Sequence, residues 1–227
     1  MAYCLPKSYR ERRTVLFDDH EKLDQMGVFY QPDVYHLANV LIRQARQNFV
    51  VDVGCGSAAK ALAAAKYVIG IETAANVARL NKKFPAVDQC DNDWASLVPN
   101  AKVEVNSHKW IEADLEKQAS WIDSIPPQSV VVCADVVEHL LEPDNLLNAL
   151  SKLANHKRCT LVISTPDRHL AATNKNGPPG NKKHVREWTL KEFRQLLQQF
   201  SIPVTLAFHT RNHDQPNSKQ STITVLA

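Results

Sequence analysis

A glycine turn is the feature of this sequence that most directly suggests chemistry. Residues 50–60 read VVDVGCGSAAK, an apolar run that ends in Asp52 and leads into Gly54, Cys55 and Gly56. A strand that runs into glycines lets a ligand approach the backbone closely, because glycine adopts conformations that other residues avoid. A nicotinamide, a phosphate and a methyl donor are all candidate ligands of such a turn.

Acids recur at the ends of the apolar segments that follow. Glu72 lies 20 residues beyond Asp52, where a carboxylate can accept both hydroxyl protons of a ribose, a feature that dehydrogenases share. Asp114 and Asp135 each close a later apolar segment. Because parallel strands end at one edge of a sheet, the four acids together predict a common binding site. For any one of them alone, a helix cap or a surface charge is the alternative.

The sequence DVGCGSA resembles the first motif of class I S-adenosylmethionine-dependent methyltransferases. The acid two residues before the first glycine carries the resemblance, with Ala58 in place of the last glycine of the usual pattern. A dinucleotide-binding G-x-G-x-x-G frame fits less well, because Ala59 stands at its third glycine, and a dehydrogenase remains a distant alternative. The segments YQPDVYHLA, VVVCADVVEHLLEPDNLL, VISTPDR, GPPGNKKHVREWTLKEF and NSKQSTITVLA resemble a bacterial group of these enzymes, often associated with surface-polysaccharide or glycoconjugate assembly.

This resemblance implies S-adenosylmethionine as the cofactor and roles for individual residues. In the family the glycine turn passes beneath the methionine part of the cofactor. The acid corresponding to Asp114 accepts from the adenine amino group, the amide of Leu115 meets the ring, and Asp135 lies beside the sulfonium. The full cofactor-binding set expected from the resemblance is Tyr30, Asp52, Gly54, Cys55, Gly56, Ser57, Lys60, Glu72, Asp114, Leu115, Ala134 and Asp135.

A second group of residues is expected to act on the acceptor. Methyl transfer is an in-line displacement, so the enzyme aligns the acceptor and, for a hydroxyl, removes its proton. Asp135, Glu138 and His139 would share one face of a helix, and His184 could meet them. The group resembles the E-x-x-E-H and distant histidine with which small-RNA 2′-O-methyltransferases hold a magnesium-type ion. The first acid of the group is Asp135, whose side chain is one methylene shorter than the glutamate of that pattern. We therefore weigh a divalent metal on these four residues, a metal-free base at His139 or His184 beside Asp135, and a purely structural role.

Helical and strand patterns alternate along the chain, and this alternation must position the two groups. We predict a single Rossmann-like α/β domain over residues 1–227, with a mostly parallel seven-stranded sheet, an antiparallel final strand and helices on both faces. Residues 1–30 are an N-terminal extension. The expected strands are residues 48–54, 67–72, 109–115, 129–135, 159–165, 203–210 and 221–227. The expected helices are residues 34–42, 58–65, 136–155 with a proline interruption, and 188–200 with a capping box at Thr189 and Glu192.

Residues 166–188 form a long loop that we expect to be a substrate lid. A segment of this length with little regular pattern is uncommon in a compact domain unless it binds a ligand. Its basic residues favour an anionic acceptor, such as a sugar phosphate or an RNA terminus, over a merely solvated loop; they are Arg168, Lys175, Lys182, Lys183 and Arg186. RNA is the less favoured of the two, because no aromatic residues alternate with these cations to stack on bases.

Composition sets the remaining limits. The chain has 227 residues, 44 % of them hydrophobic, which suits one domain, and its net charge of +3 permits an anionic partner without requiring one. No apolar run is long enough for a bilayer and no signal peptide is evident, so we expect a cytoplasmic protein whose five scattered cysteines are reduced thiols. Three functions remain: O-methylation of a saccharide or other small anionic acceptor, metal-dependent 2′-O-methylation of RNA, and non-catalytic S-adenosylmethionine binding by a partner or regulatory protein.

Overall fold

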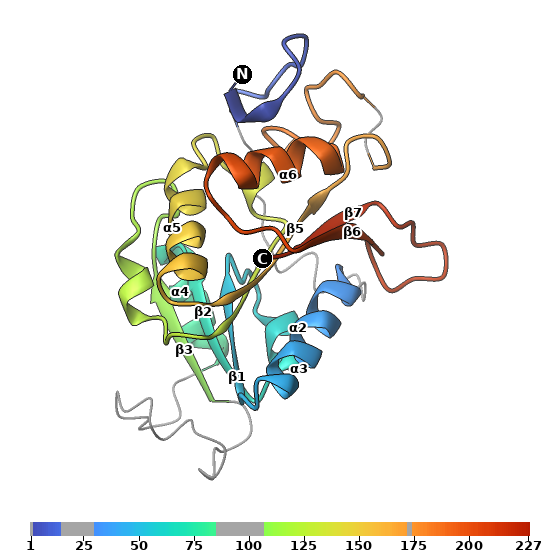
Figure 1. Ribbon diagram of the computed structural model, residues 1–227. Helices are drawn as coiled ribbons and strands as arrows, with labels where there is room; N and C mark the ends of the chain where they lie inside the picture. Colours follow the sequence, from blue (N-terminus) through green and yellow to red (C-terminus); the bar gives the residue numbers. More distant parts are fainter. Residues whose placement is uncertain (1, 15–29, 85–106, 172–173) are drawn as a thin grey trace.

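One mixed sheet organises the chain. The computed structural model describes residues 2–14, 30–84, 107–171 and 174–227, and in them seven strands pair in the order β3-β2-β1-β4-β5-β7-β6 (Figure 1). Strands β1 to β5 are parallel to one another, whereas β7 runs antiparallel to both β5 and β6. The fold prediction is therefore confirmed. The strands are β1 (Phe49–Val53), β2 (Tyr67–Glu72), β3 (Ser107–Glu112), β4 (Val130–Ala134), β5 (Thr160–Pro166), β6 (Leu206–Thr210) and β7 (Thr222–Leu226).

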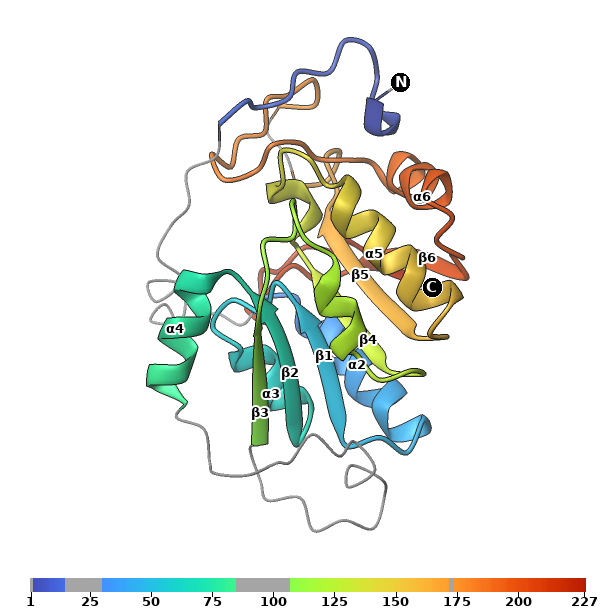
Figure 2. The same cartoon turned by 90° about the vertical axis from the view of Figure 1, so that its left-hand side faces the viewer.

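Helices cover both faces of this sheet (Figure 2). Helices α2 (Pro32–Gln44) and α3 (Ala59–Ala64) pack on one face, and α5 (Asp144–Asn155) and α6 (Leu190–Gln199) pack on the other. Helix α4 (Ala74–Lys83), which the sequence patterns did not indicate, lies against β3. Helix α6 begins with the expected capping box, in which Thr189 and Glu192 each satisfy a backbone N–H of the other.

The central strands read as continuous apolar runs because both of their faces are buried. Alternate side chains of each strand enter different cores, as the two-residue period of a strand requires. The core under α2 and α3 receives Val50, Val68, Val132 and Val162. The core under α5 and α6 receives Val51, Ile69, Val131 and Ile163.

Two local expectations differ from the structure, and both concern segments at the carboxyl edge of the sheet. The predicted helix over residues 136–155 divides into a 3₁₀ turn at Val137–His139 and α5, which starts only after Pro143, since proline is tolerated at a helix start but not in its interior. The third strand was expected at residues 109–115 and is observed at Ser107–Glu112. Asp114 therefore lies just beyond the strand rather than within it.

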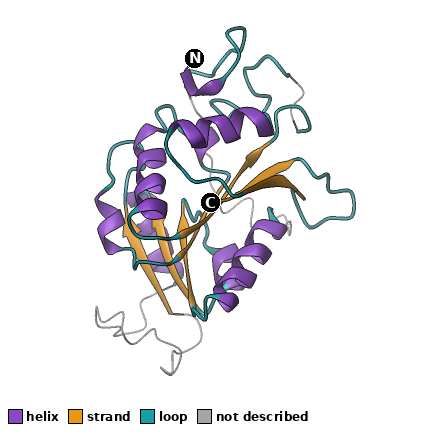
Figure 3. Cartoon of the chain, in the orientation of Figure 1, coloured by secondary structure: helices purple, strands orange, loops and turns teal. Residues whose placement is uncertain are grey.

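Residues 2–14 of the expected N-terminal extension lie along the loop between β5 and α6 (Figure 1). Figure 3 draws this loop mainly as coil. Two backbone bonds join the segments: the Arg10 amide donates to Asn176 O at 2.9 Å and the Arg12 amide donates to Val185 O at 2.8 Å. None of the helices in the described residues combines the length and apolarity needed to cross a bilayer.

Candidate functional site

The glycine turn follows directly from the end of β1. Gly54 and Gly56 have φ values of 72° and 55°, in the left-handed region that glycine enters at little cost. A Cβ atom at Gly54 would lie only 2.6 Å from Cγ2 of Val136, so a side chain has no room there. The backbone between β1 and α3 is thus shaped by residues that leave its surface bare, as a closely approaching ligand requires.

Ala58, the departure from the family motif, has a left-handed backbone of its own. Its φ is 60° and it directly precedes α3. Glycine adopts this conformation freely, whereas for alanine it costs about 1–2 kcal/mol. A left-handed backbone at this position favours glycine, which is the residue of the family pattern, although this chain has alanine there.

Glu72 is fixed beside the glycine turn by backbone donors. The Gly56 amide donates to Oε1 at 3.1 Å and the Thr73 amide donates to Oε2 at 2.6 Å. The side chain is buried at the carboxyl end of β2. Strand pairing thus brings together a carboxylate and a bare turn that lie 16 residues apart in the chain.

Asp114 and Leu115 lie at the same edge of the sheet, two and three residues beyond β3. The Ala113 amide donates to Glu72 O at 2.8 Å, which places this segment next to the Glu72 backbone. Asp114 accepts from the Glu116 amide at 3.1 Å and from Lys117 Nζ at 2.8 Å, and the Lys117 bond lowers its pKa. Leu115 is buried. Asp114 is thus placed at the predicted edge while it also caps a local turn.

Asp52 is buried under α2. The Tyr35 hydroxyl donates to its carboxylate, at 3.1 Å to Oδ2 and 3.3 Å to Oδ1. Burial raises the pKa of Asp52 to about 7, although Lys60 and the Tyr35 bond act in the opposite direction. Tyr35 was not a predicted site residue, because it lies off the apolar face that marks the helix and nothing in its sequence surroundings signals a buried partner.

The remaining residues of the expected cofactor set surround this point. Cys55 is buried within the glycine turn and Ala134 is buried at the end of β4. Tyr30 precedes α2 and forms an isolated bridge with His213. The predicted cofactor residues thus lie at the carboxyl ends of the four strands β1 to β4, with Ser57 and Lys60 following the turn into α3 and Tyr30 on the approach to α2.

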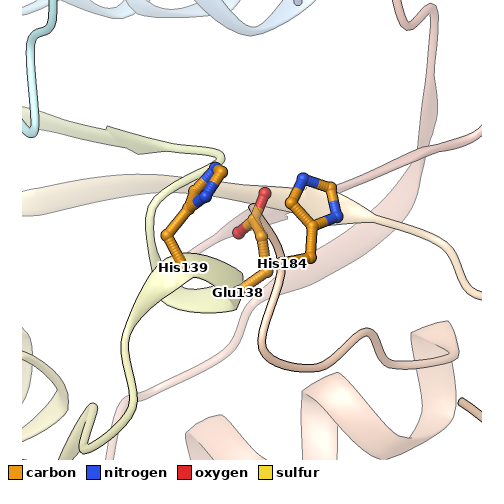
Figure 4. Close-up of side chains that lie close together, drawn as sticks. All are labelled: Glu138, His139 and His184. Atoms are coloured by element: carbon orange, nitrogen blue, oxygen red, sulfur yellow. The ribbon is translucent and has the colours of Figure 1, made fainter. Parts of the chain in front are cut away.

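A possible metal-binding group lies beyond β4. Glu138, His139 and His184 each offer a ligand atom, and these atoms lie within 4.8 Å of one another (Figure 4). Glu138 is fully buried; Thr165 Oγ1 donates to its Oε2 at 3.1 Å, whereas its Oε1 has no hydrogen-bond partner within the described parts of the chain. Burial, and next the Asp135 charge, raise its pKa well above the ordinary value. A cation would supply the partner that this oxygen lacks.

Both imidazoles are oriented by acceptors on the loop after β5. Nδ1 of His139 lies 3.0 Å from Lys183 O, and since a carbonyl only accepts, this nitrogen donates and the lone pair is on Nε2. Nδ1 of His184 lies 2.6 Å from Oε1 of the buried Glu187. A carboxylate behind a histidine is a recurrent arrangement at metal sites. Glu187 was not predicted from the sequence, because only the folded loop turns it toward His184.

Asp135, the expected first ligand, lies outside this group. Its φ of 53° is left-handed, and its carboxylate accepts from Ser164 Oγ at 2.7 Å and from Gln31 Nε2. The expected spacing assumed an α-helix, whereas the segment is a 3₁₀ turn that begins after Asp135. The structure therefore brings together three of the four predicted ligands and directs Asp135 toward α2.

Comparison with known proteins places these features in a family. No curated protein sequence matches the chain. Among solved structures, it is similar to the methyltransferase domain of bacterial CtHen1-CN, with a TM-score of 0.55 and 18 % identity over 86 % of this chain and 97 % of that one. It is also similar to the small RNA methyltransferase HEN1 (TM-score 0.56, 16 % identity, 95 % of this chain and 26 % of that one). A third similar structure is the magnesium protoporphyrin IX methyltransferase ChlM from Synechocystis PCC 6803 with bound SAM. Its TM-score is 0.52 and its identity is 16 % over 94 % of this chain and 86 % of that one.

These structural similarities establish the fold, since all are below 25 % identity. The family comes from a sequence model described as a methyltransferase domain, which matches residues 29–202. That range includes the glycine turn, the four strand-end acids and the Glu138, His139 and His184 group. Because the match extends over well above half of the chain, this protein belongs to the methyltransferase-domain family and is an S-adenosylmethionine-dependent methyltransferase.

Proposed function

We propose that this enzyme methylates a hydroxyl oxygen of a small anionic acceptor, such as a phosphorylated saccharide, with a divalent metal held by Glu138, His139 and His184. The observation that carries the proposal is that Oε1 of the fully buried Glu138, beside two oriented imidazoles, has no hydrogen-bond partner among the residues that the structure describes. A buried carboxylate oxygen with neither a donor nor a cation beside it is costly, and Thr165 donates only to the other oxygen of Glu138, so a bound cation would remove that cost.

One carboxylate oxygen with two imidazoles fits a manganese-type transition-metal ion better than magnesium, which prefers oxygen ligands alone. The acceptor could supply further oxygen ligands. When bound, the ion would lower the pKa of an acceptor hydroxyl. Hydrogen bonds within the protein orient the ligand atoms: Lys183 O orients the His139 ring and Glu187 orients the His184 ring. Thr165 orients the Glu138 carboxylate. The strand-end residues, Glu72 among them, would hold the donor opposite.

The cations that could recognise an anionic acceptor differ from those expected. Arg168 and Arg186 are buried, Arg168 paired with Glu192 at 2.7 Å and Arg186 paired with Glu11 at 2.6 Å. They support the loop rather than face solvent. The exposed cations near the loop come from both paired segments; they are Lys7, Arg10, Arg13, Lys175 and Lys182. Because Lys182 lies two residues from His184, an acceptor phosphate could contact it while its hydroxyl reaches the metal group.

A second candidate acceptor is the 2′-hydroxyl of an RNA ribose. The same exposed cations would suit backbone phosphates, and two of the similar solved structures are described as Hen1 proteins, one of them a small RNA methyltransferase. The same metal group would serve either acceptor, so the two candidates differ only in the substrate.

The experiment compares metal-free and metal-loaded enzyme. Protein treated with chelator is assayed with labelled S-adenosylmethionine against phosphorylated saccharides and short RNAs, before and after manganese is added, and manganese binding is measured by calorimetry. Glu138→Gln and His184→Ala should lose manganese binding and transfer together, while His156→Ala, at an exposed histidine after α5, should lose neither. Transfer that is indifferent to chelator and depends on His184 alone would instead identify a metal-free base and refute the metal.

A further inference from the structure

The N-terminal residues 9–12 run along the loop between β5 and α6 and hold it at several points (Figure 2). Arg12 is half-buried and makes three of these contacts. Its Nη2 donates to Pro179 O at 2.6 Å, its Nε donates to His184 O at 3.3 Å, and its amide donates to Val185 O at 2.8 Å. One guanidinium thus joins two separate parts of the loop. We call residues 9–12 the N-terminal clasp.

Tyr9 holds the same loop at Glu187. The Tyr9 hydroxyl accepts from the Glu187 amide at 2.9 Å, and the Arg168 guanidinium lies 4.8 Å from the centre of the Tyr9 ring. Arg168 in turn donates from Nη1 to Glu187 O at 3.2 Å. Both backbone polar groups of Glu187 are therefore hydrogen-bonded, and the clasp fixes both ends of residues 179–187, which we call the clasped stretch.

A glycine of the loop allows the clasp to approach closely. Gly177 has a left-handed φ of 64°, and a Cβ atom there would lie 2.2 Å from Arg10 O and 2.9 Å from Cζ of Tyr9. The carbonyl of its neighbour Asn176 accepts from the Arg10 amide at 2.9 Å. A side chain at position 177 would therefore collide with the backbone of the clasp, so the loop and the clasp are shaped to fit each other.

The clasped stretch carries the groups that orient the two imidazoles of the metal-binding group. Lys183 O accepts from His139 Nδ1, and Glu187 accepts from His184 Nδ1. Asn181 Oδ1 accepts from the Lys183 amide at 3.0 Å, so the other end of that side chain, Nδ2, is the one that lies 2.9 Å from His184 Nε2 and donates to it. The His184 ring is thus held with its proton on Nδ1 and its lone pair on Nε2. An ion bound at Nε2 would displace the exposed Asn181 amide.

We propose that Tyr9 and Arg12 are positioning residues, which keep the His184 ring oriented for metal binding. Each acts through the backbone of the clasped stretch and not on an ion or a substrate. The clasp lies outside residues 29–202, so this support comes from a segment that the family match does not include. The metal-binding part of the inference rests on the proposed function, whereas the orientation of the ring does not.

Two variants loosen the clasp. Tyr9→Phe keeps the ring that packs against Arg168 and removes only the oxygen that accepts from Glu187. Arg12→Gln is too short to reach both carbonyls, and Arg13→Gln, at the exposed next residue, is the matched control. By calorimetry with manganese alone, we expect each clasp variant to bind about tenfold weaker than the wild type, since groups behind a metal ligand typically change its affinity by about 10–100-fold. Arg13→Gln should match the wild type, and the affinity for S-adenosylhomocysteine should be unchanged in all three.

The orientation of the His184 ring is measured separately, in metal-free protein labelled with ¹⁵N at histidine. Ring ¹⁵N shifts report which nitrogen carries the proton, and the His184 signals are identified by their absence in His184→Ala. The wild type and Arg13→Gln should show the proton on Nδ1, whereas Tyr9→Phe and Arg12→Gln should show a mixture of the two tautomers.

The two measurements separate this inference from the proposed function. Unchanged ring shifts in both clasp variants, wild-type affinity of both for manganese, or an equal loss of S-adenosylhomocysteine binding would overturn the proposal. The first two results would leave the clasp a merely structural support, and the third would indicate general damage. If the ring shifts change but the wild type binds no manganese, the clasp orients His184 and it is the proposed metal that fails.

Discussion

Replacing Asp52 by asparagine tests how strongly a buried carboxylate destabilises the ligand-free enzyme. Asp52 is 1 % exposed, and burial raises its pKa from the ordinary 3.8 to about 7. A difference of that size in pKa between the folded and unfolded chain corresponds to about 4 kcal/mol. Asparagine has no charge to desolvate and its oxygen can still accept from Tyr35. Allowing about 1 kcal/mol for an imperfect hydrogen bond, we expect Asp52→Asn to stabilise the protein by about 3 kcal/mol at pH 8.

The pH dependence shows whether ionisation of Asp52 raises or lowers the free energy of unfolding. Well below pH 4 the carboxyl is protonated in both the folded and the unfolded chain, so ionisation of Asp52 contributes nothing to stability. From about pH 4 to 7 the unfolded chain loses the proton while the folded chain retains it, and the free energy of unfolding contributed by Asp52 falls as the pH rises. Above pH 7 both forms are ionised and the penalty is constant.

Urea unfolding curves from pH 4.5 to 8 measure this contribution. Asp135 and Glu138 are also buried with raised pKa values, so they contribute to the slope of the wild type, but they do so equally in Asp52→Asn. The difference between the two curves therefore isolates Asp52. Asp123→Asn, at an exposed aspartate, is the control and should follow the wild type. If wild type and Asp52→Asn gave parallel curves over this range, Asp52 would have an ordinary pKa and the argument would be wrong.

Three further predictions concern the cofactor site and the loop. Gly56→Val should abolish S-adenosylhomocysteine binding by calorimetry while circular dichroism stays native, because a β-branched residue resists the φ of 55° and would occupy the ligand's space; retained affinity would contradict this. Glu72→Gln should weaken S-adenosylhomocysteine binding about tenfold, since each hydrogen bond to a charged carboxylate contributes about 1.5–3 kcal/mol. If only the binding of the methyl-acceptor substrate became weaker, Glu72 would not belong to the cofactor site. Arg168→Leu should lower the melting temperature by about 6–12 °C, since it leaves Glu192 without its ion pair at a cost of about 3 kcal/mol; an unchanged melting temperature would show that the pair is not stabilising.

The sequence by itself determined the architecture, and it predicted one half of the candidate site. Parallel strands with both faces buried are apolar throughout, so runs such as YVIGIE identify them locally, and their alternation with helices predicts that they are parallel. Gly54, Gly56 and Glu72 could be predicted as site residues for a related reason. Each proposed role depends on a backbone conformation or on the end of a strand, and both are properties of a few consecutive residues.

Only the tertiary structure decided which side chains meet. Gln31 and Asp135 are 104 residues apart, and their contact depends on how α2 crosses the sheet. Glu187 became the partner of His184 because the loop after β5 is fastened by the N-terminal segment, whose Tyr9 hydroxyl accepts from the Glu187 amide. Asp135 does not lie with the other predicted metal ligands, because the residues after β4 form a tight turn rather than an α-helix. Such contacts arise from packing between distant segments, and no local pattern in a single sequence records that packing.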